Sequence, residues 1–121
     1  MSDLLNVVVL DDDEDLSTLL ITILKHYSIR AIRCSNVEEA GELLRTQKPQ
    51  LLLSDMLLTG SDGRDFCRWL RSNEEFKGLK IMMMSAYPDA ELACRAAGAD
   101  DFAAKPFEMD ELIDKIQKLL A

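Results

Sequence analysis

The sequence has little of what several classes of protein require. It contains one histidine and three cysteines, and Cys34, Cys67 and Cys94 are widely spaced with no C-x-x-C pair. This odd, scattered set excludes a disulfide scaffold and argues against a zinc site, and we expect reduced core thiols in a cytoplasmic protein. Because His26 is the only histidine, a Ser-His-Asp arrangement that includes Ser85 is not supported.

Long apolar runs and an excess of basic residues are also missing. Runs such as Leu51–Leu53 and Ile81–Met84 are too short to cross a bilayer, and Met1-Ser2-Asp3 does not open a secretory signal. The 14 Lys and Arg residues against 22 Asp and Glu give a formal net charge of −8. That charge argues against nucleic acid or an anionic membrane as a direct partner.

The glycine-rich loops that cradle phosphates are absent as well. The chain has neither G-x-x-x-x-G-K-[ST] nor G-x-G-x-x-G. Gly60 and Gly63 instead suit a turn that enters a helix beginning near Asp62. A flavin-binding domain of similar architecture would need neutral hydrogen-bond donors after the first strand, where this chain has acids.

What is present is a regular alternation of short apolar runs with longer helical patterns, over 121 residues and without an internal repeat. The apolar runs lie near Leu5–Leu10, Ala31–Cys34, Leu51–Ser54, Leu79–Met84 and Asp101–Ala104. Five β-then-α units require parallel strands with helices on both faces of the sheet. The sequence therefore predicts a single α/β domain, 1–121, with a doubly wound (βα)5 arrangement.

Helical spacing identifies the faces that should pack on this sheet. The face predicted for the first helix consists of Leu16, Leu19, Leu20, Ile23, Leu24 and Tyr27. Ser35-x-x-Glu38 is a candidate capping box for the second helix. The face predicted for the fourth consists of Leu92, Ala93, Ala96 and Ala97, with Gly98 as the residue that ends the helix.

Polar residues follow four of the five apolar runs. The first leads into Asp11-Asp12-Asp13, the third into Asp55, the fourth into Ser85-Ala86 and the fifth into Lys105-Pro106. In an open parallel sheet the functional site lies at the carboxyl ends of the strands. We therefore expect three or more carboxylates, a hydroxyl and an ammonium to converge at one edge.

The combination of Asp55 with the acidic run indicates a particular chemistry. Acids are favoured at helix N-termini, so the run alone has a structural explanation, but a carboxylate directly after the apolar run Leu51–Ser54 has none. Neighbouring carboxylates repel and need a cation, and their oxygens suit Mg²⁺. With Lys105 as a second positive charge, phosphoryl transfer is predicted, with Asp55 as the nucleophile that forms an aspartyl phosphate.

These residues carry a resemblance that covers essentially the whole chain. The motifs are Val8-Val9-Leu10-Asp11-Asp12-Asp13, Leu53-Ser54-Asp55-Met56-x-x-x-Gly60-x-Asp62-Gly63, Met84-Ser85-Ala86, and Gly98-Ala99-Asp100-Asp101-Phe102-x-x-Lys105-Pro106-Phe107. In this order and spacing the sequence resembles a receiver domain of a two-component response regulator.

The resemblance implies a strand order of 2-1-3-4-5 and a role for each site residue. It implies that Asp55 is the phosphoacceptor and that Asp11, Asp12, Asp55 and the backbone carbonyl of Leu57 bind Mg²⁺. It also implies that Ser85 and Ala86 form the switch end of the fourth strand. Lys105 corresponds to the phosphate-binding lysine, Phe102 to the aromatic switch residue, and Lys105–Pro106 to a cis peptide bond.

The resemblance also implies partners. The phosphoryl group would come from the phosphohistidine of a sensor histidine kinase or histidine phosphotransfer protein, and a downstream output protein or domain would respond to the phosphorylated face, the fourth and fifth strands with the helices that follow them. Such a domain catalyses its own phosphorylation and is not an enzyme with a turnover substrate. The last helix lacks the basic series of DNA-binding regulators that dimerise through this face, which leaves a homodimer open.

Two further departures from the family pattern stand out. Thr59 occupies a position where proline is usual, so we expect the loop after Asp55 to be less rigid. Phe102 replaces the commoner tyrosine and has no hydroxyl, so packing alone should set its position.

Two alternative interpretations remain open. Val7–Leu10 followed by Asp11-x-Asp13 resembles the opening motif of haloacid-dehalogenase-like phosphatases, with Asp11 as nucleophile. Asp15 in place of threonine, the lack of room for a cap domain, and an Asp55 without a role argue against this interpretation. The second alternative, a degenerate domain that is not phosphorylated, conflicts with the intact acidic pair, acceptor and lysine.

Overall fold

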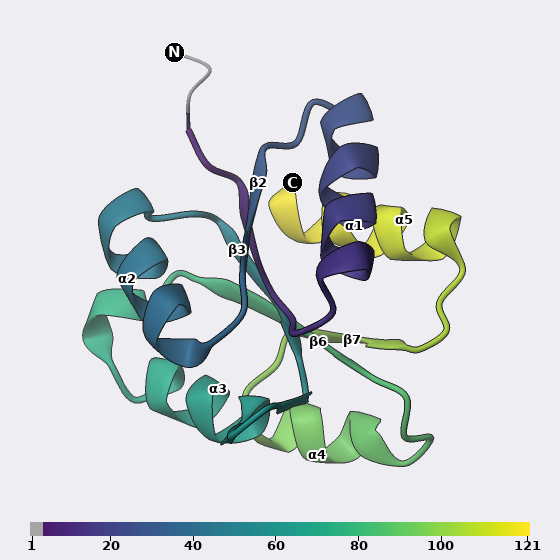
Figure 1. The fold of residues 1–121 in the computed structure, drawn as a ribbon. Helices are drawn as coiled ribbons and strands as arrows, with labels where there is room; N and C mark the ends of the chain where they lie inside the picture. Colours follow the sequence, from purple (N-terminus) through teal and green to yellow (C-terminus); the bar gives the residue numbers. More distant parts are fainter. Residues whose placement is uncertain (1–3) are drawn as a thin grey trace.

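A five-stranded parallel sheet forms the centre of the computed structural model, which describes residues 4–121 (Figure 1). Met1-Ser2-Asp3, on which the expectation about a secretory signal depended, lies outside the described residues. The strands are β1 (Val7–Leu10), β2 (Ala31–Cys34), β3 (Leu51–Asp55), β6 (Lys80–Ser85) and β7 (Asp101–Ala104). Their spatial order, β2-β1-β3-β6-β7, confirms the order 2-1-3-4-5 that the resemblance implied.

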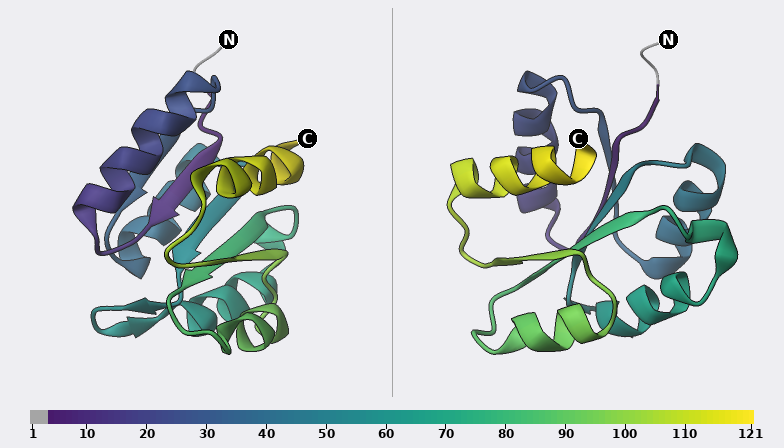
Figure 2. Two further views of the ribbon diagram at one scale, coloured as in Figure 1. Left: turned by 90° about the vertical axis from the view of Figure 1, so that its right-hand side faces the viewer. Right: turned by 180° about the vertical axis from the view of Figure 1, so that it is seen from behind.

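Helices cover both faces of the sheet, as the alternation predicted (Figure 2). The helices are α1 (Glu14–His26), α2 (Val37–Gln47), α3 (Gly63–Arg71), α4 (Ala90–Ala96) and α5 (Met109–Leu120), with a short 3-10 helix, η1 (Glu74–Phe76), after α3. Helices α1 and α5 lie on one face, and α2, α3 and α4 lie on the other.

The alternation of side chains along each strand divides the core into two layers. Val8 and Leu10 pack with residues of α2, α3 and α4, whereas Val7 and Val9 pack with residues of α1 and α5. All four β1 residues are fully buried, because β1 lies between β2 and β3 with helices on both sides. A strand buried on both faces needs apolar residues at every position, and the apolar runs satisfy that need.

Four apolar residues that spacing placed on buried helix faces are exposed. Leu19 of α1 is 50% exposed, Tyr27 at its C-cap is 46% exposed, and Leu92 of α4 is 82% exposed. Ala96 of α4 is exposed as well. The buried positions are Ser17, Leu20 and Leu24 in α1, and Ala90 and Cys94 in α4. The predictions for these four residues were wrong because apolar spacing marks a stripe wider than the strip that contacts the sheet.

The cap of α2 lies one residue later than predicted. Asn36, not Ser35, is the N-cap, and its side chain accepts a hydrogen bond from the Glu39 amide at 2.8 Å. The Glu39 carboxylate in turn accepts from the Ser35 amide at 3.2 Å. The helix start is thus closed by a reciprocal pair, with Glu39 in the place predicted for Glu38. The end of α4 agrees with the prediction, since Gly98 has φ 114.

A small hairpin follows β3 where the sequence predicted only a turn. Strands β4 (Leu57–Leu58) and β5 (Ser61–Asp62) pair antiparallel, with Leu57 opposite Asp62, and Gly60 adopts φ 79 in the turn. The Gly63 amide donates to the Met56 carbonyl at 2.6 Å and closes the base of the hairpin. The hairpin therefore begins and ends beside Asp55.

Arg71, in the last turn of α3, binds the segments that lead into β6 and β7. Its guanidinium donates to the Leu79 carbonyl at 2.7 Å, to the Gly98 carbonyl at 2.8 Å and to the Asp100 carboxylate at 2.6 Å. The same Asp100 carboxylate accepts from the Ile81 amide at 2.9 Å. The Arg71 side chain thus joins the end of α3 to the two segments that lead into β6 and β7, at the amino ends of these strands.

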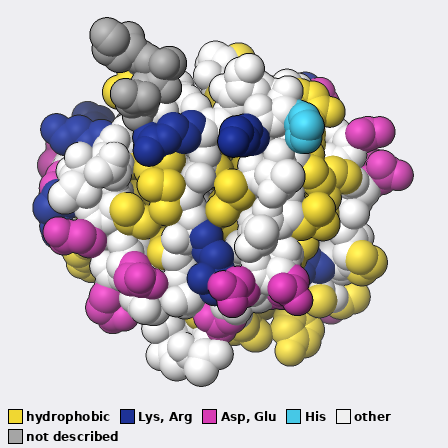
Figure 3. Space-filling model, turned by 45° about the horizontal axis from the view of Figure 1, so that its top comes forward, with side chains coloured by type: hydrophobic (Ala, Val, Ile, Leu, Met, Phe, Trp, Pro, Cys, Tyr) yellow, Lys and Arg dark blue, Asp and Glu magenta, His cyan; other side chains and the backbone are white. Residues whose placement is uncertain are grey.

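Charged side chains cover part of the surface in Figure 3, and the three cysteines lie in the core. Figure 3 shows a row of Lys and Arg side chains across the upper part of one face and further basic side chains at its centre, with acidic side chains mostly along its lower and outer margins. Cys34, Cys67 and Cys94 are free and buried as predicted, and burial raises the pKa of the Cys34 thiol to about 12. No helix within residues 4–121 is long and apolar enough to span a membrane.

The base of the hairpin leaves no room for a side chain at Gly63. A Cβ atom built there would fall on the carbonyl oxygen of Asp55 and lie 3.0 Å from that of Met56. We expect Gly63→Ala to lower the free energy of unfolding by about 1–3 kcal/mol through forced displacement of the end of β3. Gly41→Ala, in α2 with open space around its Cβ, should instead raise it by about 0.5–1 kcal/mol. Urea unfolding of both variants checks this, and equal effects would contradict it.

Candidate functional site

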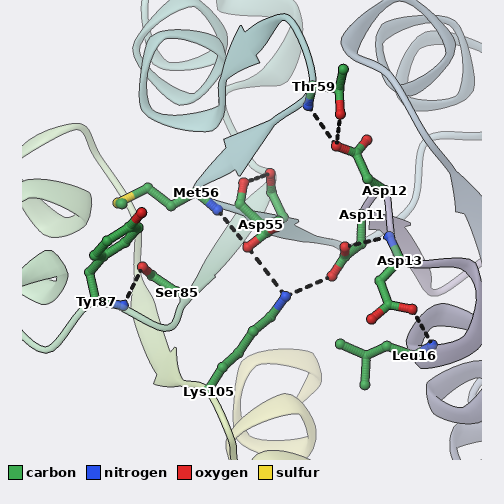
Figure 4. A network of polar contacts seen from close by, with 11 residues as sticks. Asp11, Asp12, Asp13, Leu16, Asp55, Met56, Thr59, Ser85, Tyr87 and Lys105 are labelled. Atoms are coloured by element: carbon green, nitrogen blue, oxygen red, sulfur yellow. Dashed lines mark hydrogen bonds and ion pairs between the residues drawn. The ribbon is translucent and has the colours of Figure 1, made fainter.

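The polar residues predicted at the strand ends meet at one edge of the sheet (Figure 4). Asp11 and Asp12 follow β1, Asp55 is the last residue of β3, Ser85 ends β6, and Lys105 follows β7. The sheet brings them together because neighbouring parallel strands end at a common edge, with Leu10 paired to Ser54 and Asp55 paired to Met84. The predicted convergence is therefore present.

The Lys105 ammonium lies between two carboxylates. Its Nζ is 3.1 Å from Asp11 Oδ2 and 3.4 Å from Asp55 Oδ1 (Figure 4). The Asp11 side chain is 2% exposed, and those of Asp55 and Lys105 are about one-fifth exposed. Hydrogen bonds from the Asp13 amide to Asp11 at 2.9 Å and from the Met56 amide to Asp55 at 3.1 Å fix both carboxylates. The result is a largely buried centre in which two acidic side chains share one ammonium.

Burial and charge shift the pKa values of this centre. Burial raises the pKa of Asp55, and the neighbouring Asp11 charge adds to the rise, while Lys105 opposes it only in part. Burial lowers the pKa of Lys105, but the hydrogen bond and charge of Asp11 and the charge of Asp55 outweigh this effect, so its pKa is raised. Lys105 is therefore cationic at neutral pH, and the Asp55 carboxylate lacks enough positive charge around it.

Asp12 and Asp13 point away from this centre and have different contacts. Asp13 is the N-cap of α1, and its side chain accepts from the Leu16 amide at 3.0 Å. Asp12 Oδ2 accepts two hydrogen bonds from Thr59, one from the amide at 2.6 Å and one from the hydroxyl at 2.8 Å. Sequence reasoning treated Thr59 only as the sign of a less rigid loop. In the structure Thr59 also joins the loop to Asp12 through these two hydrogen bonds, and no sequence pattern pairs two residues 47 apart.

The remaining predicted residues lie on the β6–β7 side of the site. Ser85 is buried, and its hydroxyl accepts from the Tyr87 amide at 3.0 Å, whereas Ala86 is exposed. Phe102 is 5% exposed and belongs to the core layer that contains the α4 residues Ala90 and Cys94. The Lys105–Pro106 bond is cis, as the resemblance implied.

The oxygen atoms at this edge are suitable ligands for a divalent cation, but in this structure they are not gathered around one common position. Asp11, Asp12, Asp55 and the Leu57 carbonyl would supply hard oxygen ligands of the type that Mg²⁺ prefers. As the side chains stand, no three histidine, cysteine or acidic residues in the described part of the chain are close enough to hold a metal ion. The donor chemistry fits Mg²⁺, while the Asp12 carboxylate is turned toward Thr59 (Figure 4).

The chain therefore belongs to the class of doubly wound α/β domains that carry their site at the carboxyl edge of the sheet, here with acidic residues around one lysine. Comparison with known families identifies which family of this class the chain belongs to. The model of the response regulator receiver domain matches residues 7–117. The chain belongs to this family, whose known role is phosphorelay signalling.

Curated relatives are longer than this chain. It is 34% identical over 116 residues to the phosphate regulon transcriptional regulatory protein PhoB of Rhizobium meliloti, covering 94% of the chain and 51% of that protein. It is 30% identical over 117 residues to the transcriptional regulatory protein GltR of Pseudomonas aeruginosa, covering 95% of the chain and 48% of that protein. The chain thus spans about half the length of these relatives.

Solved structures agree in fold along nearly the whole chain. A response regulator receiver protein from Pseudomonas putida superimposes with a TM-score of 0.85 at 29% identity, covering 94% of this chain and 96% of that one. The signal receiver domain of a signal transduction histidine kinase from Syntrophus aciditrophicus gives a TM-score of 0.86 at 26% identity, covering 95% and 89%. Receiver domains of this fold therefore occur both in response regulators and in a histidine kinase.

The phosphatase alternative loses its support at this point. It requires Asp11 as an accessible nucleophile, whereas Asp11 is 1% exposed and its two oxygens accept hydrogen bonds from the Asp13 amide and the Lys105 ammonium. Asp55 is the more accessible of the two carboxylates beside Lys105. The family match and the greater exposure of Asp55 both favour the receiver-domain interpretation over the phosphatase.

The raised pKa of Asp55 predicts that its charge destabilises the metal-free protein. We expect Asp55→Asn to raise the melting temperature in EDTA at pH 7 by a few degrees, because it removes a carboxylate that Lys105 only partly neutralises. The gain should disappear as the pH falls below 3.8, the ordinary pKa, where folded and unfolded Asp55 are both protonated.

Asp89→Asn is the matched control for this measurement. Asp89 is exposed and makes no side-chain cap hydrogen bond, so its variant should melt close to the wild type at both pH values. An Asp55→Asn variant that melts at or below the wild-type temperature at pH 7 would contradict the prediction.

Proposed function

We propose that this chain is a single receiver domain, 1–121, that accepts a phosphoryl group on Asp55 from a partner's phosphohistidine. The observation that carries the proposal is the position of Lys105, whose ammonium lies 3.4 Å from Asp55 and 3.1 Å from Asp11. A fixed cation beside a carboxylate at the open edge of a sheet suits an incoming phosphoryl group, whose oxygens need positive charge around them.

In this proposal the chain's own residues position and activate the acceptor. The Met56 amide and Lys105 hold Asp55 Oδ1, which fixes the direction of the carboxylate. Burial disfavours the charge on the Asp55 carboxylate. Transfer of the phosphoryl group from the phosphohistidine nitrogen to Asp55 would form an acyl phosphate, whose negative charge lies on the phosphoryl oxygens and not on the carboxyl group. Asp11, Asp12, Asp55 and the Leu57 carbonyl would hold Mg²⁺, which neutralises charge on the phosphoryl oxygens when it is bound.

The partners we propose follow from the family and the surface. A sensor histidine kinase or histidine phosphotransfer protein would donate the phosphoryl group, and a downstream output protein or domain would bind the β6–α4–β7–α5 face. Leu92 on α4 is 82% exposed, so this face offers an apolar contact. The names of the relatives describe transcriptional and DNA-binding regulators, but with a net charge of −8 this chain is not itself the part we expect to bind DNA.

The proposal is tested by chemical phosphorylation. We expect the protein incubated with acetyl phosphate and Mg²⁺ to gain one phosphoryl group, which peptide mass spectrometry should place on Asp55. Asp12→Ala should reduce this labelling at least tenfold while the protein stays folded, because it removes a ligand of the cation. Wild-type protein in EDTA should behave like the variant.

Asp13→Asn is the matched control, since it changes the neighbouring acid but keeps an oxygen that caps α1. This variant should be labelled like the wild type. Labelling on Asp11 with Asp55 unmodified, or full labelling of Asp12→Ala in EDTA, would refute the proposed function.

We further propose that Ser85 couples phosphorylation to the output face. Its hydroxyl is buried at the end of β6 and accepts from Tyr87, so its proton can be donated to a phosphoryl oxygen on Asp55. A hydrogen bond of this kind is worth roughly 1.5–3 kcal/mol, which shifts a two-state population by about ten- to a hundredfold. Phe102 is already buried beneath α4, so the shift would act on its packing there and not on a hydroxyl bond.

Amide NMR with beryllofluoride, a mimic of the aspartyl phosphate, tests this coupling. In Ser85→Ala we expect beryllofluoride to bind while the shift changes on β6, α4 and β7 fall to a small fraction of the wild-type values. Ser54→Ala is the control, because the Ser54 hydroxyl is equally buried but donates to the Asp55 carbonyl at 2.9 Å. Shift changes of full size in Ser85→Ala would show that the coupling runs through other atoms.

A further inference from the structure

The contact between Thr59 and Asp12 joins the tip of the hairpin to the acidic edge. Both Thr59 donors, the amide at 2.6 Å and the hydroxyl at 2.8 Å, bind the same carboxylate oxygen of Asp12 (Figure 4). Hydrogen bonds to an ionised acceptor are among the strong ones in proteins. Asp12 is an exposed residue with little packing around it, so these bonds decide where its carboxylate lies.

The hairpin is held firmly at its base, which leaves the tip as the part that Asp12 controls. At the base, the Gly63 amide donates to the Met56 carbonyl at 2.6 Å, and Arg64 forms a salt bridge of 2.6 Å with Asp62. Thr59 and Gly60 lie at the turn between β4 and β5, and both are exposed. A change at Asp12 is therefore transmitted to the turn and not to the base.

The position of Asp12 also determines the charge at the acidic centre. Asp11 and Asp55 already share the single ammonium of Lys105. A third carboxylate turned toward them raises the negative charge further, and this is favourable only when a cation is present. The structure shows Asp12 on Thr59, and an arrangement with Asp12 turned toward Asp11 and Asp55 would be favourable only with a cation bound there.

We propose that Thr59 is a positioning residue that competes with the divalent cation for Asp12. Cation binding withdraws the carboxylate from Thr59 and releases the turn of the β4–β5 hairpin, so cation occupancy changes the surface beside Leu57, which is 43% exposed. The apparent cation affinity is reduced by the fraction of molecules in which Thr59 holds Asp12. This inference rests on the proposed function only in taking Asp12 as a ligand of the cation.

Calorimetric titration of the unphosphorylated protein with Mg²⁺ tests the competition. Thr59→Val keeps the shape and the amide but removes the hydroxyl, and we expect it to bind Mg²⁺ up to about tenfold more tightly, which corresponds to about 1.4 kcal/mol. Thr59→Ser keeps the hydroxyl and should bind like the wild type. A Thr59→Val affinity equal to or weaker than that of the wild type overturns the proposal, because Thr59 would then be neutral or would hold Asp12 ready for the cation.

Amide NMR of residues 57–62 gives a second readout that needs no metal in the variant. In Asp12→Ala without Mg²⁺ the turn has lost its acceptor, so its shifts should approach those of the wild type saturated with Mg²⁺. Asp12→Asn keeps an oxygen for Thr59, and its hairpin shifts should stay close to those of the metal-free wild type. Hairpin shifts in Asp12→Ala that match the metal-free wild type overturn the proposal, even if Thr59→Val fails to fold.

The same titrations separate this inference from the proposed function. If Asp12→Ala binds Mg²⁺ as tightly as the wild type, Asp12 is not a ligand, and the proposed metal site fails together with the inference. If Asp12→Ala loses Mg²⁺ binding while Thr59→Val binds like the wild type, the metal site stands and only the competition by Thr59 is refuted.

Discussion

The contact of the Lys105 ammonium with Asp11 and Asp55 is the interaction on which the rest of the site depends. It joins the end of β1, the end of β3 and the segment after β7, so three of the five strands meet at one cation. A carboxylate as buried as Asp11 is stable only with a charged partner, and the sheet supplies that partner 94 residues away in sequence. Fold and chemistry are therefore coupled. The Lys105 ammonium holds the strand ends together, but because it is shared by two carboxylates it neutralises Asp55 only in part.

Backbone geometry keeps this edge open for chemistry. The close approach of Gly63 to the Asp55 carbonyl and the hydrogen bond from its amide to Met56 turn the chain sharply away from the end of β3. The carboxylate of Asp55 thus lies at the carboxyl edge of the sheet, where it stays about one-fifth exposed. After the neighbouring strand, β1, Asp13 caps α1. Its role is therefore structural and differs from the roles of Asp11 and Asp12.

The sequence was most informative where residues follow buried strands. Asp11, Asp55, Ser85 and Lys105 were predicted to meet because parallel strands end at one edge, and the strand order came from the family resemblance. Helix faces were less predictable: the spacing rule included Leu92 because it counts apolar residues and not the width of the contact with the sheet. The Thr59–Asp12 contact could not be predicted, because it depends on the short hairpin of β4 and β5. Each of these strands has only two residues, too few to show a periodic apolar pattern in the sequence.

Arg71 gives the sheet two ends of different mechanical character. At the amino ends of β6 and β7, its bonds to Leu79, Gly98 and Asp100 fix the spacing between the strands. At the carboxyl ends, the corresponding contacts are the ion pairs of Lys105 with Asp11 and Asp55. The two ends of the sheet are therefore held by different kinds of contact, at the amino ends by one guanidinium bound mainly to backbone carbonyls and at the carboxyl ends by ion pairs between side chains.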